Sequence, residues 1–236
     1  MKVIETSDLK KYYNPDTELE VRALDGVNLS VDQGEFTAVV GPSGSGKTTL
    51  LNIIGGLDKP TFGQVLIDGQ EITSFSENDL IDYRLHNIGF VFQAYNLIPV
   101  LSAYENAEFI MLLQGKSEAE RRKRVNKLLK DVGLEKQINK RPTHLSGGQQ
   151  QRVAVARALA SKPKFVLADE PTANLDSKAT TQLLDIMKRL NEEENITFIF
   201  STHDQRVIDR AKRVVTLDDG KIISDVLQKQ PEMQTK

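Results

Sequence analysis

A glycine-rich segment has the residue types and spacing of a phosphate-binding loop. Residues Gly41–Thr48 match the pattern G-x-x-x-x-G-K-[S/T] in full. A strand-like run, Phe36–Val40, leads into the segment, and a helix-like stretch, Thr48–Ile54, follows it. Glycines let successive backbone N–H groups converge on phosphate oxygens, and the helix N-terminus adds the positive end of its dipole. The alternative, an accidental Gly- and Ser-rich turn, is disfavoured by this strand–helix context.

Within this loop, two side chains have roles that follow from their chemistry. We expect Lys47 to reach the β- and γ-phosphates of a nucleotide and the Thr48 hydroxyl to bind Mg²⁺. The other residues that we expect to contact the nucleotide here are Gly41, Pro42, Ser43, Gly44, Ser45, Gly46 and Thr49.

Two carboxylates, Asp169 and Glu170, follow a second apolar run, Phe165–Ala168. A carboxylate at the end of a buried strand is what the metal of a phosphate-loop enzyme needs, so Asp169 is predicted to hold Mg²⁺, directly or through water. Glu170 is well placed to polarise an attacking water. A helix N-cap or a solvated pair would explain the same residues, and the phosphate loop in the same chain favours the catalytic interpretation.

A third motif, Leu145–Gln149, stands just before the helix-like stretch Gln150–Ala160. A serine and two glycines ahead of a helix form a second anion-binding helix end. One nucleotide does not need two such loops about 100 residues apart. The sequence therefore predicts that this loop binds a nucleotide held by another copy of the chain. An S-G-G turn without the other motifs would not indicate a binding site.

The elements that position these motifs alternate between strand-like and helix-like patterns, which favours an α/β core with a largely parallel sheet. Asp-Gly pairs in Val65–Gly69 and Asp218–Ile223 indicate hairpins and antiparallel additions. From about Ala103 to Ala160 the pattern is almost entirely helical, with a capping box at Ser117–Glu120, and we interpret this region, at about 95–160 in the chain, as an inserted helical lobe. The strand-like runs are Phe36–Val40, Ile88–Phe92, Phe165–Ala168, Ile196–Phe200 and Arg213–Leu217.

Composition restricts the classes of protein further. The chain has 236 residues, 39% of them hydrophobic and 27% charged, and is predicted to form one domain over 1–236 with a short polar tail at 224–236. The formal net charge is −2, and the basic run Arg121–Arg124 follows Glu118 and Glu120 by one helical turn, so we expect a solvated, ion-paired face and no nucleic-acid partner. Cysteine is absent, which excludes disulfides and fits a reducing cytoplasm. No apolar run approaches the ~18–20 residues that span a bilayer, so a membrane partner would be a separate chain.

Six motifs in order resemble those of the ATP-binding-cassette (ABC) ATPases: the phosphate loop, Gln93, Leu145–Gln149, Asp169-Glu170, Asn174-Leu175-Asp176 and His203. The resemblance implies an α/β fold with a phosphate-loop NTPase (RecA-like) core, an antiparallel β subdomain and an inserted all-helical subdomain. It also implies an ATPase that uses ATP and Mg²⁺ and works as a dimer of two copies beside an integral membrane permease. Such a subunit would be cytoplasmic and peripheral at the inner face of the cell membrane.

The resemblance also implies roles for single residues. Tyr13 would stack on adenine, with Tyr12 as the alternative, and Gln93 would sense Mg²⁺ and the attacking water while contacting the permease. His203 would hold the γ-phosphate and orient Glu170. The predicted contacts to the opposite protomer are Ser146, Gly147, Gly148, Gln149 and Asp176.

The resemblance is sharper to the cassettes of lipoprotein release, macrolide export and cell division, through Val21–Val27, Asn52–Asp58, Gly89–Gln93, Asn96–Pro99, Leu145–Arg152 and Ser201–Asp204. This branch implies export or mechanical work outside the membrane. An importer subunit and a soluble ABC ATPase outside transport are the alternatives. A regulatory GTPase lacks its guanine-reading motif here, and a DNA-repair or chromosome-organising ATPase would need a long coiled-coil insertion. A two-cassette translation factor and a non-catalytic scaffold also fit less well, because the chain has one cassette with Lys47 and Glu170 intact.

Overall fold

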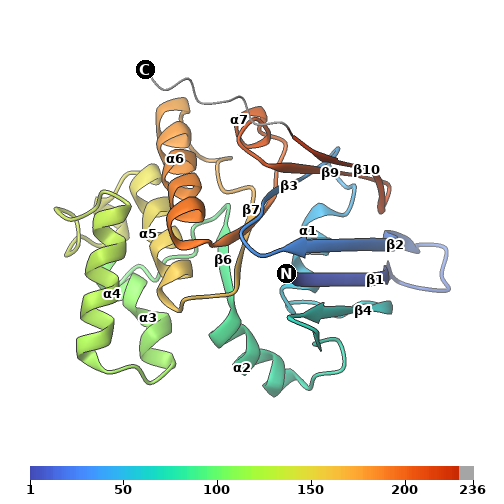
Figure 1. Ribbon diagram of the computed structural model, residues 1–236, viewed down its shortest axis with the longest axis horizontal. Coiled ribbons are helices and arrows are strands. Elements are labelled where there is room, and N and C mark those ends of the chain that lie inside the picture. Colours follow the sequence, from blue (N-terminus) through green and yellow to red (C-terminus); the bar gives the residue numbers. More distant parts are fainter. Residues whose placement is uncertain (229–236) are drawn as a thin grey trace.

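In the computed structural model, which describes residues 1–228, two sheets and a group of helices lie side by side (Figure 1). The strands are β1 (Lys2–Tyr13), β2 (Val21–Asp32), β3 (Phe36–Val40), β4 (Phe62–Ile67), β5 (Gln70–Glu71), β6 (Ile88–Phe92), β7 (Phe165–Asp169), β8 (Thr197–Ser201), β9 (Arg213–Asp218) and β10 (Lys221–Leu227). The helices are α1 (Lys47–Ile54), α2 (Glu77–Asn87), α3 (Ala103–Leu113), α4 (Glu118–Asp131), the 3₁₀ helix η1 (Pro142–His144), α5 (Gly147–Ala160), α6 (Ser177–Glu194) and α7 (Gln205–Ile208).

The six-stranded sheet has the order β10-β9-β3-β8-β7-β6. Strands β9, β3, β8, β7 and β6 pair in parallel, so the predicted α/β core is confirmed. Because parallel strands end at the same edge, the segments that follow β3, β8, β7 and β6 meet there. Phe92, Asp169 and Ser201 are partners in one row across β6, β7 and β8.

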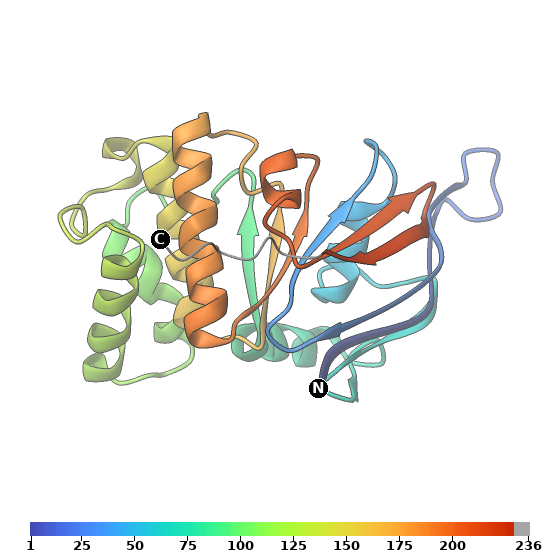
Figure 2. The same ribbon diagram turned by 45° about the horizontal axis from the view of Figure 1, so that its top comes forward.

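The central strands β3, β7 and β8 of this sheet are buried on both faces, which explains why they are apolar without alternation. Ala38, Phe198 and Phe200 face a core shared with α3, α4, α5 and α6. Val39 and Ile199, their neighbours along the strands, face a second core shared with α1, α2 and the antiparallel sheet. Figure 2 shows the sheet between these two sides of the molecule.

The antiparallel sheet has the order β2-β1-β4-β5, and its two long strands, β1 and β2, were not among the predicted strands. Several register shifts interrupt their pairing, and Asp8 and Gly26 have positive φ, so polar–apolar alternation is broken along both strands. The hairpin predicted at Val65–Gly69 joins β4 to β5, as expected.

The hairpin predicted at Asp218–Ile223 is also present, but it extends the edge of the six-stranded sheet. Its second strand continues to Leu227, so the predicted tail at 224–236 starts too early. Three of its residues pair with β9 as Asp225↔Val215, Val226↔Val214 and Leu227↔Arg213, and Arg213 also forms an ion pair with Asp225. Residues 229–236 of the predicted tail lie outside the described residues.

The region predicted as helical contains α3, α4, η1 and α5, after a non-helical segment at 95–102. The capping box at Ser117 and Glu120 is present at the start of α4. The ion pairs of the basic run differ from the expectation, because they reach other helices. Arg121 pairs with Glu108 of α3 at 2.5 Å, and Arg124 pairs with Glu194 of α6 at 3.1 Å.

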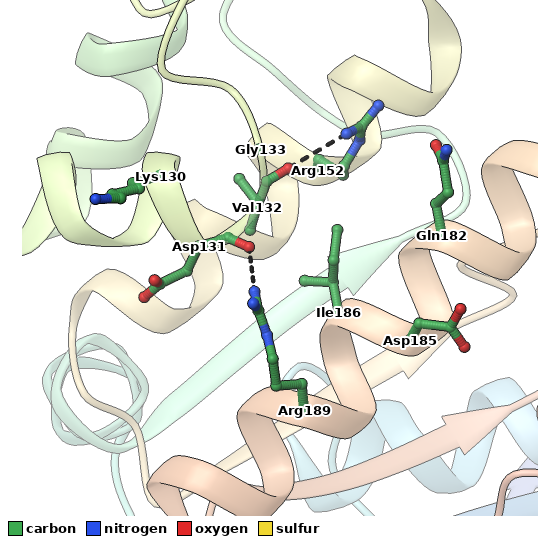
Figure 3. Close-up of a pocket in the computed structure, with 9 residues that line it drawn as sticks. All are labelled: Lys130, Asp131, Val132, Gly133, Arg152, Gln182, Asp185, Ile186 and Arg189. Carbon is green, nitrogen blue, oxygen red and sulfur yellow. Dashed lines mark hydrogen bonds between the residues drawn. The ribbon is translucent and has the colours of Figure 1, made fainter. Parts of the chain in front are cut away.

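Two arginines fasten the end of α4 to the neighbouring helices, around a cavity of about 510 Å³ (Figure 3). Arg152 of α5 donates to the Val132 carbonyl at 3.3 Å, and Arg189 of α6 donates to the Asp131 carbonyl. Guanidinium groups at a helix C-terminus satisfy its free carbonyls and its dipole, so this cavity has a structural explanation. Within residues 1–228, no helix is both long and apolar enough to cross a membrane.

Candidate nucleotide-binding site

A cavity of about 1070 Å³ lies where the phosphate loop meets the carboxyl edge of the parallel sheet. The loop, β2 and the segments after β6, β7 and β8 contribute to its wall. The lining residues are Glu20, Val21, Arg22, Ala23, Gly41, Pro42, Ser43, Gly44, Gly46, Lys47, Thr48, Thr49, Gln93, Glu170, Ala173, Ser201, His203 and Asp219. The structure therefore brings together most of the residues that the sequence predicts for the phosphates.

The phosphate loop joins β3 to α1, and its backbone carbonyls accept hydrogen bonds from Lys47. Lys47 is 9% exposed, and its ammonium donates to the carbonyls of Gly41 at 2.9 Å and Pro42 at 2.8 Å. Ser45, which does not line the cavity, has a buried hydroxyl without a hydrogen-bond partner among the described residues. A phosphate above the loop would offer the lysine stronger, charged acceptors than these two carbonyls.

Thr48 and Asp169 form the pair that could hold a magnesium ion. The Thr48 hydroxyl donates to Asp169 Oδ1 at 3.1 Å and Oδ2 at 3.2 Å, across 121 residues of sequence. Within residues 1–228, no group of three His, Cys, Asp or Glu side chains could hold a metal by itself. A hydroxyl and one carboxylate suit Mg²⁺, which takes oxygen ligands and is usually completed by water and substrate phosphates.

Glu170 and His203 lie just after the adjacent strands β7 and β8 and meet at the cavity. His203 Nδ1 lies 2.8 Å from Glu170 Oε1, and the Glu170 side chain is 18% exposed while that of His203 is 75% exposed. The backbone N–H of Glu170 donates to the Ser201 carbonyl at 2.9 Å, and its φ of 45° turns the chain sharply after β7. Thr202, which the sequence did not single out, places its hydroxyl 3.5 Å from Glu170 Oε2.

The turn that carries His203 is fixed by Asp204. Its carboxylate accepts from Arg206 at 2.9 and 2.7 Å, and the Thr172 hydroxyl donates to it at 3.0 Å. The Arg206 guanidinium lowers the pKa of Asp204, and burial opposes this only in part. Asp204 therefore stays charged and links the segments after β7 and β8.

Two predicted site residues, Gln93 and Tyr13, lie outside the phosphate loop. Gln93 lines the cavity, and its carbonyl accepts from Asn174 at 3.0 Å. Tyr13 does not line the cavity, but it pairs with Val21, which does. The Tyr13 hydroxyl donates to Asp58 at 3.1 Å. Its proposed contact with adenine remains a prediction.

The third motif, Leu145–Gln149, which we call the signature segment, is absent from the wall of this cavity. Ser146 caps α5 in a capping box with Gln149, so both residues stand at a helix N-terminus. Asp176 caps α6 by accepting from the Ala179 N–H at 2.7 Å. A Cβ on Gly148 would lie 2.9 Å from the Ala179 Cβ, so glycine lets the two helix N-termini approach. The structure thus gathers the five residues predicted to act on a second copy away from the phosphate loop.

Some cavity residues had no separate signal in the sequence. Glu20, Arg22 and Ala23 line it because β2 passes over the phosphate loop, and Asp219 lines it from the β9–β10 turn. The Asp25 N–H donates to the Gly220 carbonyl at 2.9 Å and joins these two segments. Beforehand, Arg22 and Ala23 stood only within the motif Val21–Val27, and Asp219 only within the predicted Asp-Gly turn.

Comparison with known proteins identifies the family. Residues 24–173 match the family model described as ABC transporter, and the chain belongs to that family. It is an ATP-binding and ATP-hydrolysing subunit of this class. The lipoprotein-releasing system ATP-binding protein LolD 1 of Rhodopseudomonas palustris is 47% identical over 221 residues, which cover 93% of this chain and 98% of that protein.

Two other relatives are informative. The macrolide export ATP-binding/permease protein MacB of Hyphomonas neptunium is 47% identical over 228 residues, or 97% of this chain, but this chain spans only 35% of that protein. The solved dimeric structure of a post-hydrolysis state of the ATP-binding cassette MJ0796 from Methanocaldococcus jannaschii, bound to ADP and Pi, has a TM-score of 0.87 and 44% identity. That match covers 96% of this chain and 99% of the other.

Proposed function

We propose that two copies of this chain close on two MgATP and thereby drive a separate membrane permease, for export or for mechanical work outside the membrane. One observation carries the proposal: Ser146–Gln149 and Asp176 lie at paired helix N-termini that do not line the chain's own phosphate cavity. Helix N-termini are suited to bind phosphate oxygens, so these residues fit the γ-phosphate of a nucleotide on another protomer. The dimeric relative supports this arrangement.

Within each site, the residues of this chain would divide the work. The phosphate-loop N–H groups and Lys47 would bind the phosphates. Thr48, Asp169 and Gln93 would hold Mg²⁺, which would neutralise phosphate charge in the transition state. Glu170 would accept a proton from the attacking water. His203, whose Nδ1 lies 2.8 Å from Glu170 Oε1, would orient the Glu170 carboxylate and contact the γ-phosphate.

The permease would dock on a groove of about 410 Å³ that starts beside the nucleotide cavity. Phe92 lines the groove and the next residue, Gln93, lines the cavity, so a permease segment in the groove would contact the chain one residue away from the nucleotide site. Phe90, Ile98 and Phe109 supply an apolar wall for a short permease segment. This contact would hold the chain at the inner face of the membrane.

The export branch is supported by the two relatives named for lipoprotein release and macrolide export. In the second of these names, ATP-binding and permease functions are joined in one protein, and the part matched here is about a third of it. We infer that this cassette works with a permease of a corresponding kind, as a unit resembling the lipoprotein-releasing ATP-binding protein that it matches over nearly its full length.

The first test is to purify the tagged chain from its native membranes in mild detergent. A permease with few membrane helices and a large external domain should co-purify. Phe109→Asp should abolish that association while leaving ATP hydrolysis by the isolated chain unchanged. Leu112→Asp, on an exposed part of α3 outside the groove, is the matched control and should retain the permease. Recovery of a many-helix importer permease, or of soluble partners alone, would contradict the export proposal.

A second test addresses the shared site. Ser146→Arg should abolish hydrolysis, because the arginine would block the surface facing the second protomer. Binding of ATP to the monomer should be unchanged, since Ser146 does not line the monomer's cavity. Loss of ATP binding by the monomer would show that the signature segment acts on its own chain's nucleotide.

A further inference from the structure

A glutamine in α5 connects three segments of the site. Gln151 is fully buried, and its side-chain nitrogen donates to the Pro171 carbonyl at 2.7 Å and to the Phe92 carbonyl at 3.4 Å. Both acceptors are remote in sequence, 20 and 59 residues away. A buried amide bonded to two backbone carbonyls fixes the positions of those peptide groups relative to the helix.

Each of the two carbonyls stands next to a residue of the nucleotide site. The Phe92 carbonyl belongs to the peptide bond with Gln93, and Pro171 directly follows Glu170. The network continues through Thr172, which donates to Asp204 at 3.0 Å beside His203. One side chain therefore positions the backbone next to Gln93 and Glu170 and reaches the His203 turn through a further hydrogen bond.

The same helix begins with the signature segment, whose N-cap is Ser146. If that segment binds the partner's nucleotide, α5 responds to one nucleotide while Gln93 and Glu170 act on the other. Gln151 lies about one helical turn from Ser146. Its amide oxygen is buried and accepts no hydrogen bond among the described residues, which raises the free energy of this arrangement.

We propose that Gln151 is a positioning residue that couples the two ATP sites of the dimer, by moving the Gln93 and Glu170 backbone when α5 binds the partner's nucleotide. The proposal rests on the two-site dimer proposed above. It goes beyond that dimer by assigning the communication between its sites to one buried side chain.

The test uses the full-length chain and steady-state ATP hydrolysis over a range of ATP concentrations. Gln151→Met keeps the side-chain length but removes both hydrogen bonds. We expect kcat to fall about tenfold, the effect of losing a buried hydrogen bond, and the Hill coefficient to fall from above 1 toward 1. Binding of a fluorescent ATP analogue to the monomer should be unchanged, because Gln151 does not line the cavity.

A matched control separates coupling from loss of stability. Asn191 is another buried amide, 2% exposed, and it donates to the carbonyls of Ile196 at 2.6 Å and Gly34 at 2.9 Å, outside the nucleotide cavity. Asn191→Leu should lower the melting temperature to a similar extent as Gln151→Met and leave the Hill coefficient at the wild-type value.

Gln151→Glu adds a pH readout that a packing role would not produce. A carboxyl group at this buried position has a raised pKa. When protonated it can donate to the Pro171 carbonyl as the amide does, and when ionised it cannot. Its kcat and Hill coefficient, relative to wild type, should therefore recover as the pH is lowered from 8 to 6. This comparison is made within one variant and decides the question even if Gln151→Met does not fold.

The outcomes are distinct. A Hill coefficient that stays at the wild-type value in Gln151→Met, or no pH-dependent recovery in Gln151→Glu, would overturn the coupling role. A wild-type chain that hydrolyses ATP without cooperativity and without forming a dimer would instead overturn the proposed two-site function.

Discussion

The shape of the phosphate loop depends on a close approach between Gly41 and β9, which a pair of alanine substitutions can test. A Cβ on Gly41 would lie 1.9 Å from the Leu217 carbonyl oxygen and 2.8 Å from the Ser45 hydroxyl. A Cβ on Gly44, in the same loop, would meet nothing within 4 Å. Both glycines have positive φ, 150° and 82° respectively, so both substitutions strain the backbone.

The difference in unfolding free energy between the two variants measures the clash of the Gly41 Cβ with the Leu217 carbonyl. Backbone strain of about 1–3 kcal/mol is common to both. Only Gly41→Ala must also separate the loop from a backbone carbonyl, and overpacking of this kind costs about 1–3 kcal/mol more. We therefore expect Gly41→Ala to unfold with a free energy about 2 kcal/mol lower than that of Gly44→Ala. This corresponds to a melting temperature about 4–8 °C lower for a chain of this size.

The assay is urea and thermal unfolding of both variants and wild type without nucleotide. Omitting nucleotide matters because Gly44 lines the cavity, so its substitution also affects phosphate binding. Equal unfolding free energies for the two variants would refute the argument that Gly41 is required by the contact with Leu217.

Three further predictions concern the site and its supports. Thr48→Ala should raise the Mg²⁺ concentration needed for half-maximal hydrolysis about tenfold, since one ligand and its bond to Asp169 are lost, and an unchanged Mg²⁺ titration would contradict the assigned metal position. Asp204→Asn should lower the free energy of unfolding by about 1 kcal/mol at pH 7. The effect is small because the Arg206 side chain is 37% exposed, so solvent screens its ion pair with Asp204. The folded pKa of Asp204 is depressed, so its stabilisation is present above the unfolded value of about 3.9 and is lost as the pH falls through the lower, folded value. The difference between wild type and Asp204→Asn should therefore shrink between pH 5 and pH 2 in denaturation curves, and a constant difference would exclude the ion pair as its cause. Asn106→Leu should lower the free energy of unfolding by about 3 kcal/mol, or the melting temperature by about 6–12 °C. The reason is that Asn106 is fully buried and hydrogen-bonds to the backbone of Ile98, Leu101 and Ser102, beside the proposed permease groove. A wild-type melting temperature for this variant would show that the conformation of residues 98–102 does not depend on the Asn106 side chain.

Local motifs were predictable from the sequence because their parts are adjacent in the chain. Gly41–Thr48 carries its own turn, lysine and helix start, and Asp169 stands at the end of an apolar strand. The strand registers then bring Phe92, Asp169 and Ser201 into one row. The capping box at Ser117 and the helix N-terminus at Ser146 are also short-range features.

Features that depend on remote partners were not predictable in the same way. The long strands β1 and β2 have irregular registers that break their alternation. The partners of Arg121 and Arg124 lie 13 and 70 residues away on other helices, whereas local spacing pointed to Glu118 and Glu120. The buried bonds of Gln151 are likewise long-range, so only the folded chain reveals them.

In the proposed mechanism, Glu170 acts on an attacking water within a nucleotide-closed dimer. Its most direct test is Glu170→Gln, which keeps the size of the side chain near His203 but cannot accept a proton. Analytical ultracentrifugation with and without MgATP, combined with a hydrolysis assay, gives both readouts. We predict hydrolysis lower by about 10²–10⁴-fold and a stable dimer that forms only with ATP. Hydrolysis at the wild-type rate, or a monomer at saturating ATP, would contradict the account.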